Sequence, residues 1–145
     1  MKNVEHILKA KSEHQTVYTI GPDESVLQAL KLLAEKNIGA LPVVEAGQVV
    51  GIVSERDYAR KLVLKGRSSA VTPVREIMSA PVVFVEPKHN LEYCMNLMTN
   101  RHLRHLPVVD NGELLGLLSI GDLVKETIAE QAGLIIKLEQ YIRGE

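Results

Sequence analysis

Residues 41–54 read LPVVEAGQVVGIVS, and residues 106–119 read LPVVDNGELLGLLS. The same offset of 65 positions aligns residues 17–58 with residues 82–123 without a gap. An internal repeat decides the architecture before any local pattern does. Two copies of one unit predict a pseudo-two-fold molecule with two equivalent crevices, so functional residues are to be sought among those that occur twice.

Each repeat is predicted to run strand, helix, strand, strand, helix. The first strands are short β-branched runs, residues 17–20 and 82–85, which end before Pro22 and Pro87. Apolar residues then recur at the spacing of a helix with one buried face, at Val26, Ala29, Leu30 and Leu33 and again at Leu91, Cys94, Met95 and Met98. The pattern predicts an α/β fold of two tandem β-α-β-β-α units, with Cys94 as a small core residue.

The second and third strands of each repeat are predicted to form a hairpin. Residues 41–44 and 48–54 flank Glu45-Ala46-Gly47, and residues 106–109 and 113–119 flank Asp110-Asn111-Gly112. Asn-Gly between apolar runs favours a type I′ turn, in which both central residues have positive φ. The continuously apolar strands predict a sheet that is covered on both faces. A helix closes each unit, over residues 55–65 and from residue 120 to about 141.

The repeat also extends upstream, because residues 4–8 resemble residues 74–78. We therefore predict a first unit over residues 4–66, a linker over 67–73 and a second unit over 74–141 with an extended C-terminal helix. That helix carries more apolar residues than one unit needs, at Leu123, Val124, Ile128, Ile135, Leu138 and Ile142. A homodimer contact is the favoured explanation, and packing of the helix onto its own domain is the alternative.

Composition excludes several classes of partner. The 145-residue chain has a net charge of −1, so it lacks the clustered positive charge that binds a phosphate backbone. Only 3% of its residues are aromatic, so it also has few side chains on which bases could stack. It contains no apolar run near 18 residues and begins without a signal-peptide core, so no membrane contact is expected. The lone cysteine, Cys94, fits the reducing cytoplasm, where we expect the protein to reside.

A shared motif closes each hairpin: glycine, two aliphatic residues, serine, and aspartate three residues later. It spans residues 51–57 and 116–122, where a strand passes into a helix. One interpretation is a helix cap, in which Ser54 and Asp57 bond each other's backbone. The other is a mononucleotide site, in which the helix start and serine bind phosphate, the carboxylate binds ribose, and glycine allows a close approach.

The copies differ in charge near this motif. Arg56 corresponds to Gly121, and the pair Gly39-Ala40 corresponds to Arg104-His105, so the two crevices are predicted to differ in affinity or ligand choice. No Cys or carboxylate cluster joins His89, His102 and His105, so no metal site is predicted. No Ser–His–Asp order, phosphate-binding glycine loop or base beside either serine is evident. We therefore expect no catalytic residue, no catalytic cofactor and no enzymatic activity.

The proline strand, the glycine hairpin and the Gly-h-h-Ser-x-x-Asp motif together resemble the CBS domain. Two such domains in tandem resemble a Bateman module, including the regulatory segment of inosine-monophosphate dehydrogenases. The resemblance covers roughly residues 4–140. It implies a module that binds AMP, ADP, ATP, NAD or S-adenosylmethionine in clefts between the two units, and that forms disc-shaped dimers.

The resemblance also implies which residues touch the ligand. Phosphate and ribose would contact Ser54, Asp57, Ser119 and Asp122. Independently of the resemblance, Arg56 at a helix start and Arg104 with His105 at the mouth of a strand are candidates to bind an anion or base, and solvated surface residues are the alternative. The adenine slot would be lined by Thr19, Ile20, Ala40, Leu41, Pro42 and Val43, or by Phe84, Val85, His105, Leu106, Pro107 and Val108. We expect an adenine-nucleotide sensor, with AMP the first candidate, that signals to a regulated protein. A ligand-free interaction or structural module is the alternative.

Overall fold

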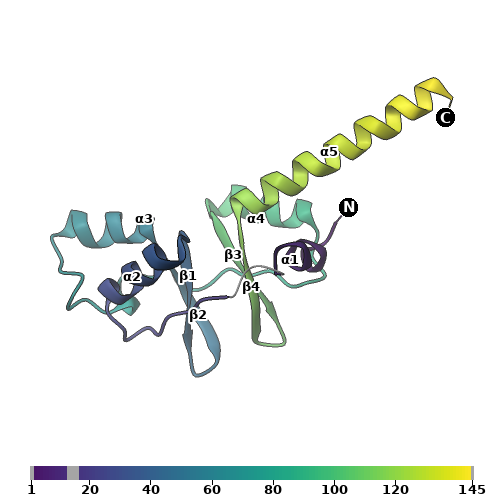
Figure 1. The fold of residues 1–145 in the computed structure, drawn as a ribbon. Coiled ribbons are helices and arrows are strands. Elements are labelled where there is room, and N and C mark those ends of the chain that lie inside the picture. The colour runs from purple at the N-terminus through teal and green to yellow at the C-terminus, as the bar shows by residue number, and fades with distance from the viewer. Residues whose placement is uncertain (1, 13–16, 145) are drawn as a thin grey trace. The chain divides into compact units, whose positions relative to one another are not determined.

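The computed structural model describes residues 2–12 and 17–144 and contains two compact units (Figure 1). The α2 unit comprises residues 17–84 and 109–115. The α1 unit joins helix α1 (Val4–Ser12) to residues 85–108 and 116–144. Each sequence repeat has a helix, a two-stranded hairpin and a closing helix. The expected tandem α/β organisation is therefore confirmed.

In the α2 unit, α2 (Val26–Lys36) has defined ends. The side chain of Ser25 accepts a hydrogen bond from the N–H of Gln28, and Asn37 terminates the helix in the left-handed conformation. The hairpin of β1 (Ala40–Glu45) and β2 (Gln48–Ser54) follows, and then α3 (Glu55–Asp57). Helical structure continues as a π-helical stretch η1 (Tyr58–Leu62) and a 3₁₀ turn η2 (Val63–Lys65). A 3₁₀ turn η3 (Val74–Glu76) completes the unit.

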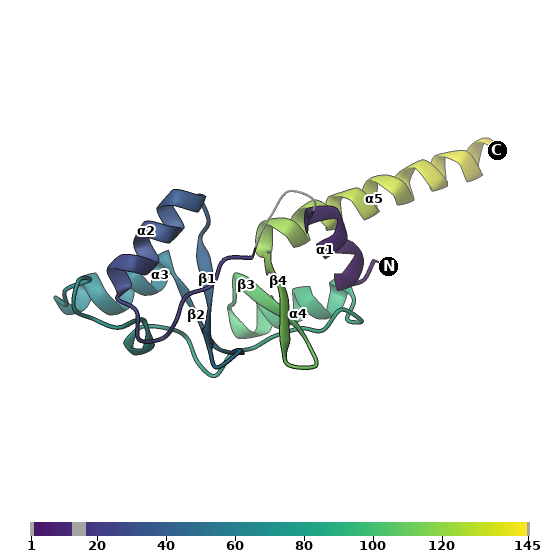
Figure 2. The same cartoon turned by 60° about the horizontal axis from the view of Figure 1, so that its bottom comes forward.

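In the α1 unit, α4 (Leu91–Arg101) is capped by Asn90 and ends at His102, which is left-handed. Strands β3 (His105–Asp110) and β4 (Glu113–Ser119) form the second hairpin, of which residues 109–115 are counted with the α2 unit. Its turn has φ of 51° at Asn111 and 81° at Gly112, which confirms the turn predicted from Asn-Gly. Helix α5 (Ile120–Arg143) leaves β4, and Figure 2 shows its distal half running clear of the other elements of its unit.

The predicted first strand of each repeat is wrong in extent. Ile20 makes one parallel bridge to Val43, and Val85 makes one to Val108. Ile20 still donates its N–H to the carbonyl of Pro42 at 3.1 Å, so the segment lies beside β1 without becoming a strand. Pro22, two residues further on, has no N–H to continue a ladder.

Each unit contains the upstream segment of the other repeat. Helix α1 precedes the first repeat but belongs to the unit of the second, whereas η3 precedes the second repeat and belongs to the unit of the first. A Cβ built on Gly116 would lie 2.7 Å from Leu8, and one on Gly51 would lie 2.8 Å from Met78. These glycines therefore allow the close approach of an exchanged segment, whereas the sequence interpretation had them allow the close approach of a ligand. The predicted boundaries 4–66 and 74–141 follow the repeat along the chain and differ from this exchanged partition.

The predicted linker over residues 67–73 packs onto the start of α2. The carbonyl of Thr72 accepts from the N–H of Val26 at 2.8 Å, and that of Ser69 accepts from Leu27 at 2.9 Å. These bonds satisfy N–H groups that a helix start leaves without intrahelical partners. The segment thus secures α2 in addition to joining the repeats.

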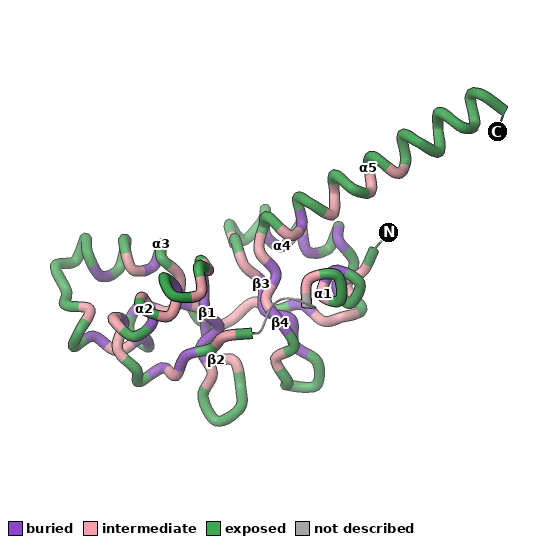
Figure 3. Tube along the Cα trace, in the orientation of Figure 1, coloured by how far each residue is buried: buried purple, intermediate pink, exposed green. Residues whose placement is uncertain are grey.

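Buried aliphatic residues form the cores of the units, and the purple segments of the trace in Figure 3 mark where buried residues lie. The α2-unit core is formed by Ile20, Val26, Ala29, Leu33, Leu41, Val43, Val53, Leu62, Val74 and Ile77. Cys94 is fully buried, and burial raises the pKa of its thiol to about 11, which confirms its prediction as a core residue. Within residues 2–12 and 17–144, no helix combines the length and apolarity needed to cross a membrane.

Candidate functional sites

The two serine–aspartate motifs form capping boxes at the turns from strand to helix. In the α2 unit, Oδ2 of Asp57 accepts from the N–H of Ser54 at 3.0 Å, and Oγ of Ser54 accepts from the N–H of Asp57 at 3.1 Å. In the α1 unit, the equivalent bonds of Ser119 and Asp122 measure 2.8 and 3.1 Å. The helix-cap interpretation is thus confirmed in both units, and the ligand interpretation must be compatible with it.

Asp57 is saturated by its own unit. Its Oδ2 also accepts from Oγ of Ser54 at 3.0 Å, while Oδ1 accepts from Oγ of Ser79 at 3.3 Å and pairs with Nζ of Lys61 at 3.1 Å. Lys61 further donates to the carbonyl of Ile77 at 3.2 Å. A carboxylate offers about four lone-pair positions, and these contacts occupy them. The residue is also 9% exposed, so a ligand must displace a protein partner to reach it.

Asp122 retains acceptor capacity. Its Oδ2 accepts from Ser119 and from Nζ of Lys11 at 2.6 Å, and Lys11 also donates to the carbonyl of Leu117 at 2.7 Å. Among the described residues, the bonds from Lys11 and from the N–H of Ser119 both fall on Oδ2, so Oδ1 is the oxygen with fewer protein donors around it. Burial alone would raise the pKa of Asp122, but the bonds from Lys11 and Ser119 bring it below its ordinary value. The group is therefore an anion at neutral pH.

The backbone at each helix start is arranged alike. The N–H of Glu55 donates to the carbonyl of Gly39 at 3.2 Å, and that of Ile120 donates to Arg104 at 2.9 Å. The third helical N–H in each unit donates to the serine of the cap. The second helical N–H belongs to Arg56 or Gly121, and it makes no loop or cap hydrogen bond with the residues that the structure describes. A free N–H at a helix start is a suitable donor to an anionic oxygen.

The residues predicted to line an adenine slot lie beside these motifs. Ala40 is directly opposite Ser54 in the β1–β2 register, and Ile20 bonds to Pro42. The side chains of Ile20, Ala40, Leu41 and Val43 are at most 5% exposed, as are those of Val85, Leu106 and Val108. These whole residues form core, so a ligand would reach them only if their surroundings rearranged. Thr19 and Phe84 are exposed at the ends of the same segments.

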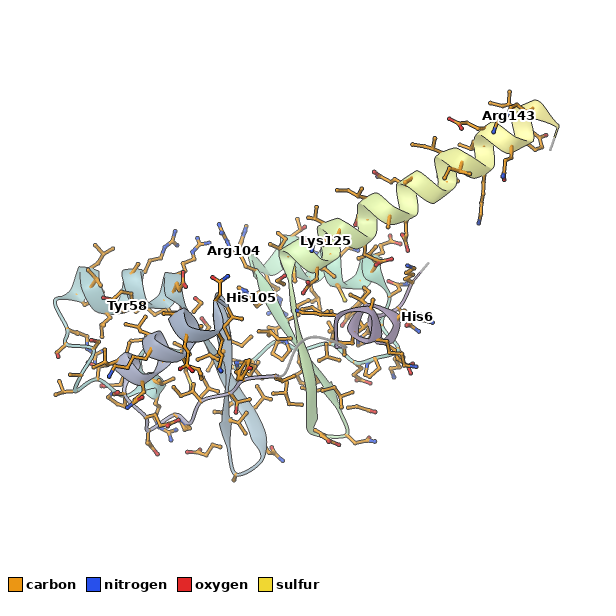
Figure 4. All side chains as sticks on the ribbon, viewed as in Figure 1. His6, Tyr58, Arg104, His105, Lys125 and Arg143 are labelled. Carbon is orange, nitrogen blue, oxygen red and sulfur yellow. The ribbon has the colours of Figure 1, made fainter. Side chains whose placement is uncertain are left out.

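Arg104 and His105 stand where the chain enters β3 (Figure 4). Arg104 is exposed and His105 is half-buried. Burial lowers the pKa of His105, Lys11 and Arg104 lower it further, and Asp122 opposes them. His105 is therefore neutral at pH 7, with an imidazole suited to hydrogen bonding. The equivalent residues of the α2 unit, Gly39 and Ala40, offer neither group, so the two candidate sites are chemically different. Arg56 is exposed on α3.

His89 and His102 serve local structure. Nδ1 of His89 accepts from the N–H of Glu86 at 2.9 Å, and its ring stacks on Tyr93 with centroids 4.1 Å apart. His102 ends α4. No group of three metal-ligating side chains occurs among the residues described.

Three polar residues of these sites were not identified from the sequence: Lys11, Lys61 and Ser79. Lys61 stands four residues after Asp57 in a helix, a spacing that brings side chains together, so this ion pair had a local signal. Lys11 lies 111 positions from Asp122, and only the exchange of α1 brings them into contact.

Comparison with known proteins identifies the family. The CBS-domain model matches residues 13–64 and 74–128, so the chain belongs to the CBS-domain family, with two copies of the domain. A solved CBS-domain protein from Burkholderia ambifaria MC40-6 is 55% identical, with a TM-score of 0.84 over 90% of this chain and 96% of that one. These matches confirm the predicted resemblance to a tandem CBS pair.

Three further relatives extend the comparison. The mitochondrial CBS domain-containing protein CBSX3 of Arabidopsis thaliana is 36% identical over 94% of this chain and 68% of its own length. The inosine-5′-monophosphate dehydrogenase of Thermoplasma acidophilum is 33% identical over 85% of this chain but only 25% of the enzyme. A solved structure of CBSX2 in complex with AMP is 29% identical, with a TM-score of 0.70 over 90% of this chain and 99% of that chain.

Proposed function

We propose that this protein is a regulatory module that binds an adenine nucleotide, with AMP as the first candidate and ADP, ATP or NAD as others. The observation that carries the proposal is the recurrence, in both units, of a Ser–Asp pair and an open helical N–H beside a buried proline strand. The family relationship to CBSX2, whose structure contains AMP, supports the choice of ligand.

The two units contribute unequally to this function. In the α1 unit, Oδ1 of Asp122 accepts a hydrogen bond from a ribose hydroxyl. The N–H of Gly121 donates to phosphate, and no side chain on Gly121 hinders the approach. Arg104 and His105 add polar contacts. In the α2 unit, ribose must exchange with Ser79 or Lys61 on Asp57. Because displaced hydrogen bonds reduce the net gain from new ones, the Asp122 site binds more tightly.

Calorimetric titration with AMP tests the proposal. Asp122→Asn keeps the size of the side chain but changes its charge and acceptors, and it should weaken binding by roughly 10–100-fold, as expected when a charged hydrogen bond is lost. Asp57→Asn is the matched variant in the other unit. It should change the AMP affinity of the tighter site, the one at Asp122, less than Asp122→Asn does. Circular dichroism of both variants controls for loss of the caps. An unchanged AMP affinity in Asp122→Asn would refute the assignment.

The alternative is a ligand-free interaction module, in which the Ser–Asp pairs serve only as helix caps. The saturated contacts of Asp57 favour it in the α2 unit. It predicts no heat on titration with AMP, ADP, ATP or NAD, and a lower melting temperature as the sole effect of either asparagine variant.

The remaining features of the proposal concern context. We propose a cytoplasmic homodimer that reports the adenine-nucleotide level to a regulated protein and catalyses no reaction itself. Chromatography after long incubation with AMP, ATP or NAD should recover the nucleotide intact. Binding needs only to favour one of two conformations or assemblies of the module to carry a signal.

A further inference from the structure

The distal part of α5 presents an apolar face that is exposed among the residues the structure describes. Leu123 is buried against the α1 unit, and Lys2 pairs with Glu126 at 2.8 Å, so the start of the helix is held. Further on, residues 134–144 are exposed, as the green half of the helix in Figure 3 shows. Five large apolar residues follow one line along the helix; this seam consists of Val124, Ile128, Ile135, Leu138 and Ile142.

The spacing of the seam indicates what covers it. With Gln131 included, successive members are separated alternately by four and three residues, the heptad spacing of two helices packed along their length. Ile128, Ile135 and Ile142 are 61%, 56% and 81% exposed, so the α1 unit does not use this face. Isolated helical overhangs of this length are marginal in water, and a packed partner stabilises them.

We propose that the seam binds the same seam of a second copy of this chain, with the two helices antiparallel about a two-fold axis at the level of Gly133. In that arrangement Ile128 faces Leu138 of the second copy, Val124 faces Ile142, and Gln131 faces Ile135. The contact is isologous, so one sequence satisfies both sides and the assembly closes as a dimer. Figure 4 marks Lys125 near the start of α5 and Arg143 near its tip, the two ends that come together.

Charge complementarity selects the antiparallel direction. Flanking the seam, Lys125 lies beside Glu139 of the second copy, and the symmetry repeats this ion pair at the other end. In a parallel pair, the flanking heptad positions would place Lys125 beside Ile120 and Glu139 beside Leu134, with no opposite charges. Leu134, which is 57% exposed, packs on its own symmetry mate at the centre of the antiparallel pair.

Sedimentation of the full-length chain over a concentration series tests the seam. Ile135→Glu buries a carboxylate in each helix and should weaken dimerisation by more than about 100-fold. Ile136→Glu is the matched control, because Ile136 is the next residue, is 54% exposed and lies off the seam. It should leave the dissociation constant unchanged. Both residues are exposed in one chain, so circular dichroism should show both variants folded.

The direction has its own test. Lys125→Glu brings like charges together at both ends and should weaken the dimer, and the double variant Lys125→Glu/Glu139→Lys should restore it. Three results would overturn the proposal. The wild type could be monomeric, Ile135→Glu could leave the dimer as strong as before, or neither charge variant could change the dissociation constant of the dimer. This inference rests on the homodimer proposed above but not on the nucleotide. AMP titration of the Ile136→Glu and Ile135→Glu variants therefore separates a failure of assembly from a failure of binding.

Discussion

Asp57 and Asp122 are equivalent in sequence but receive their lysine from different elements. Lys61 reaches Asp57 from the next turn of the same helical segment, whereas Lys11 reaches Asp122 from α1. Both lysines also donate to a backbone carbonyl, of Ile77 and Leu117 respectively. A repeated motif can therefore keep the same local geometry while the surroundings diverge, which gives the two proposed sites different ligand access.

The hairpin turns allow a residue-scale prediction. Ala46 has φ of 52° and Gly47 has φ of 79°, the conformation that Asn111 and Gly112 adopt in the other hairpin. A left-handed conformation costs alanine about 1–2 kcal/mol, and asparagine tolerates it better. We expect Ala46→Asn to raise stability by about 0.5–1 kcal/mol, measured by thermal denaturation. The reciprocal control Asn111→Ala should lower it by a similar amount, and the opposite ranking would contradict the explanation.

At the scale of elements, the fold depends on where the upstream segments dock. Helix α1 is held to the α1 unit by the bond from the N–H of Val4 to the carbonyl of His89 at 2.8 Å and by burial of Val4 and Ile7. The 3₁₀ turn η3 leads into Ser79, whose N–H donates to Ile52 at 2.8 Å. Each hairpin strand provides a glycine at the docking point.

Adding a methyl group at those glycines should have unequal effects. A Cβ on Gly51 would lie 2.9 Å from the backbone oxygen of Ser79, which is fixed because it accepts from the N–H of Ile52. A Cβ on Gly116 would meet only the end of the Leu8 side chain, which can rotate. We expect Gly51→Ala to cost about 1–3 kcal/mol and Gly116→Ala less, from urea denaturation midpoints. Equal losses would show that Leu8 is as constrained as the Ser79 backbone.

At the scale of the whole molecule, the proposed ligand should stabilise the folded chain. A ligand that binds only the native state at 100 times its dissociation constant adds about 2.7 kcal/mol. We expect AMP to raise the melting temperature, while guanine nucleotides at the same concentrations, which carry the same phosphate and ribose, should raise it less. Equal shifts for both would mean that the base is not recognised, and no shift for either would remove the nucleotide from the proposal.

The sequence by itself determined the duplication, helices α2, α4 and α5, both hairpins and the serine–aspartate caps. These features depend on local periodicity, on turn residues and on contacts between residues a few positions apart, and all of these can be recognised in the sequence. The tertiary structure decided that residues 17–20 and 82–85 form bridges and not strands, that α1 and η3 exchange units, and that Lys11 pairs with Asp122. These outcomes arise from contacts between distant parts of the chain, where packing against a glycine or a buried carboxylate selects the partner and no local pattern records it.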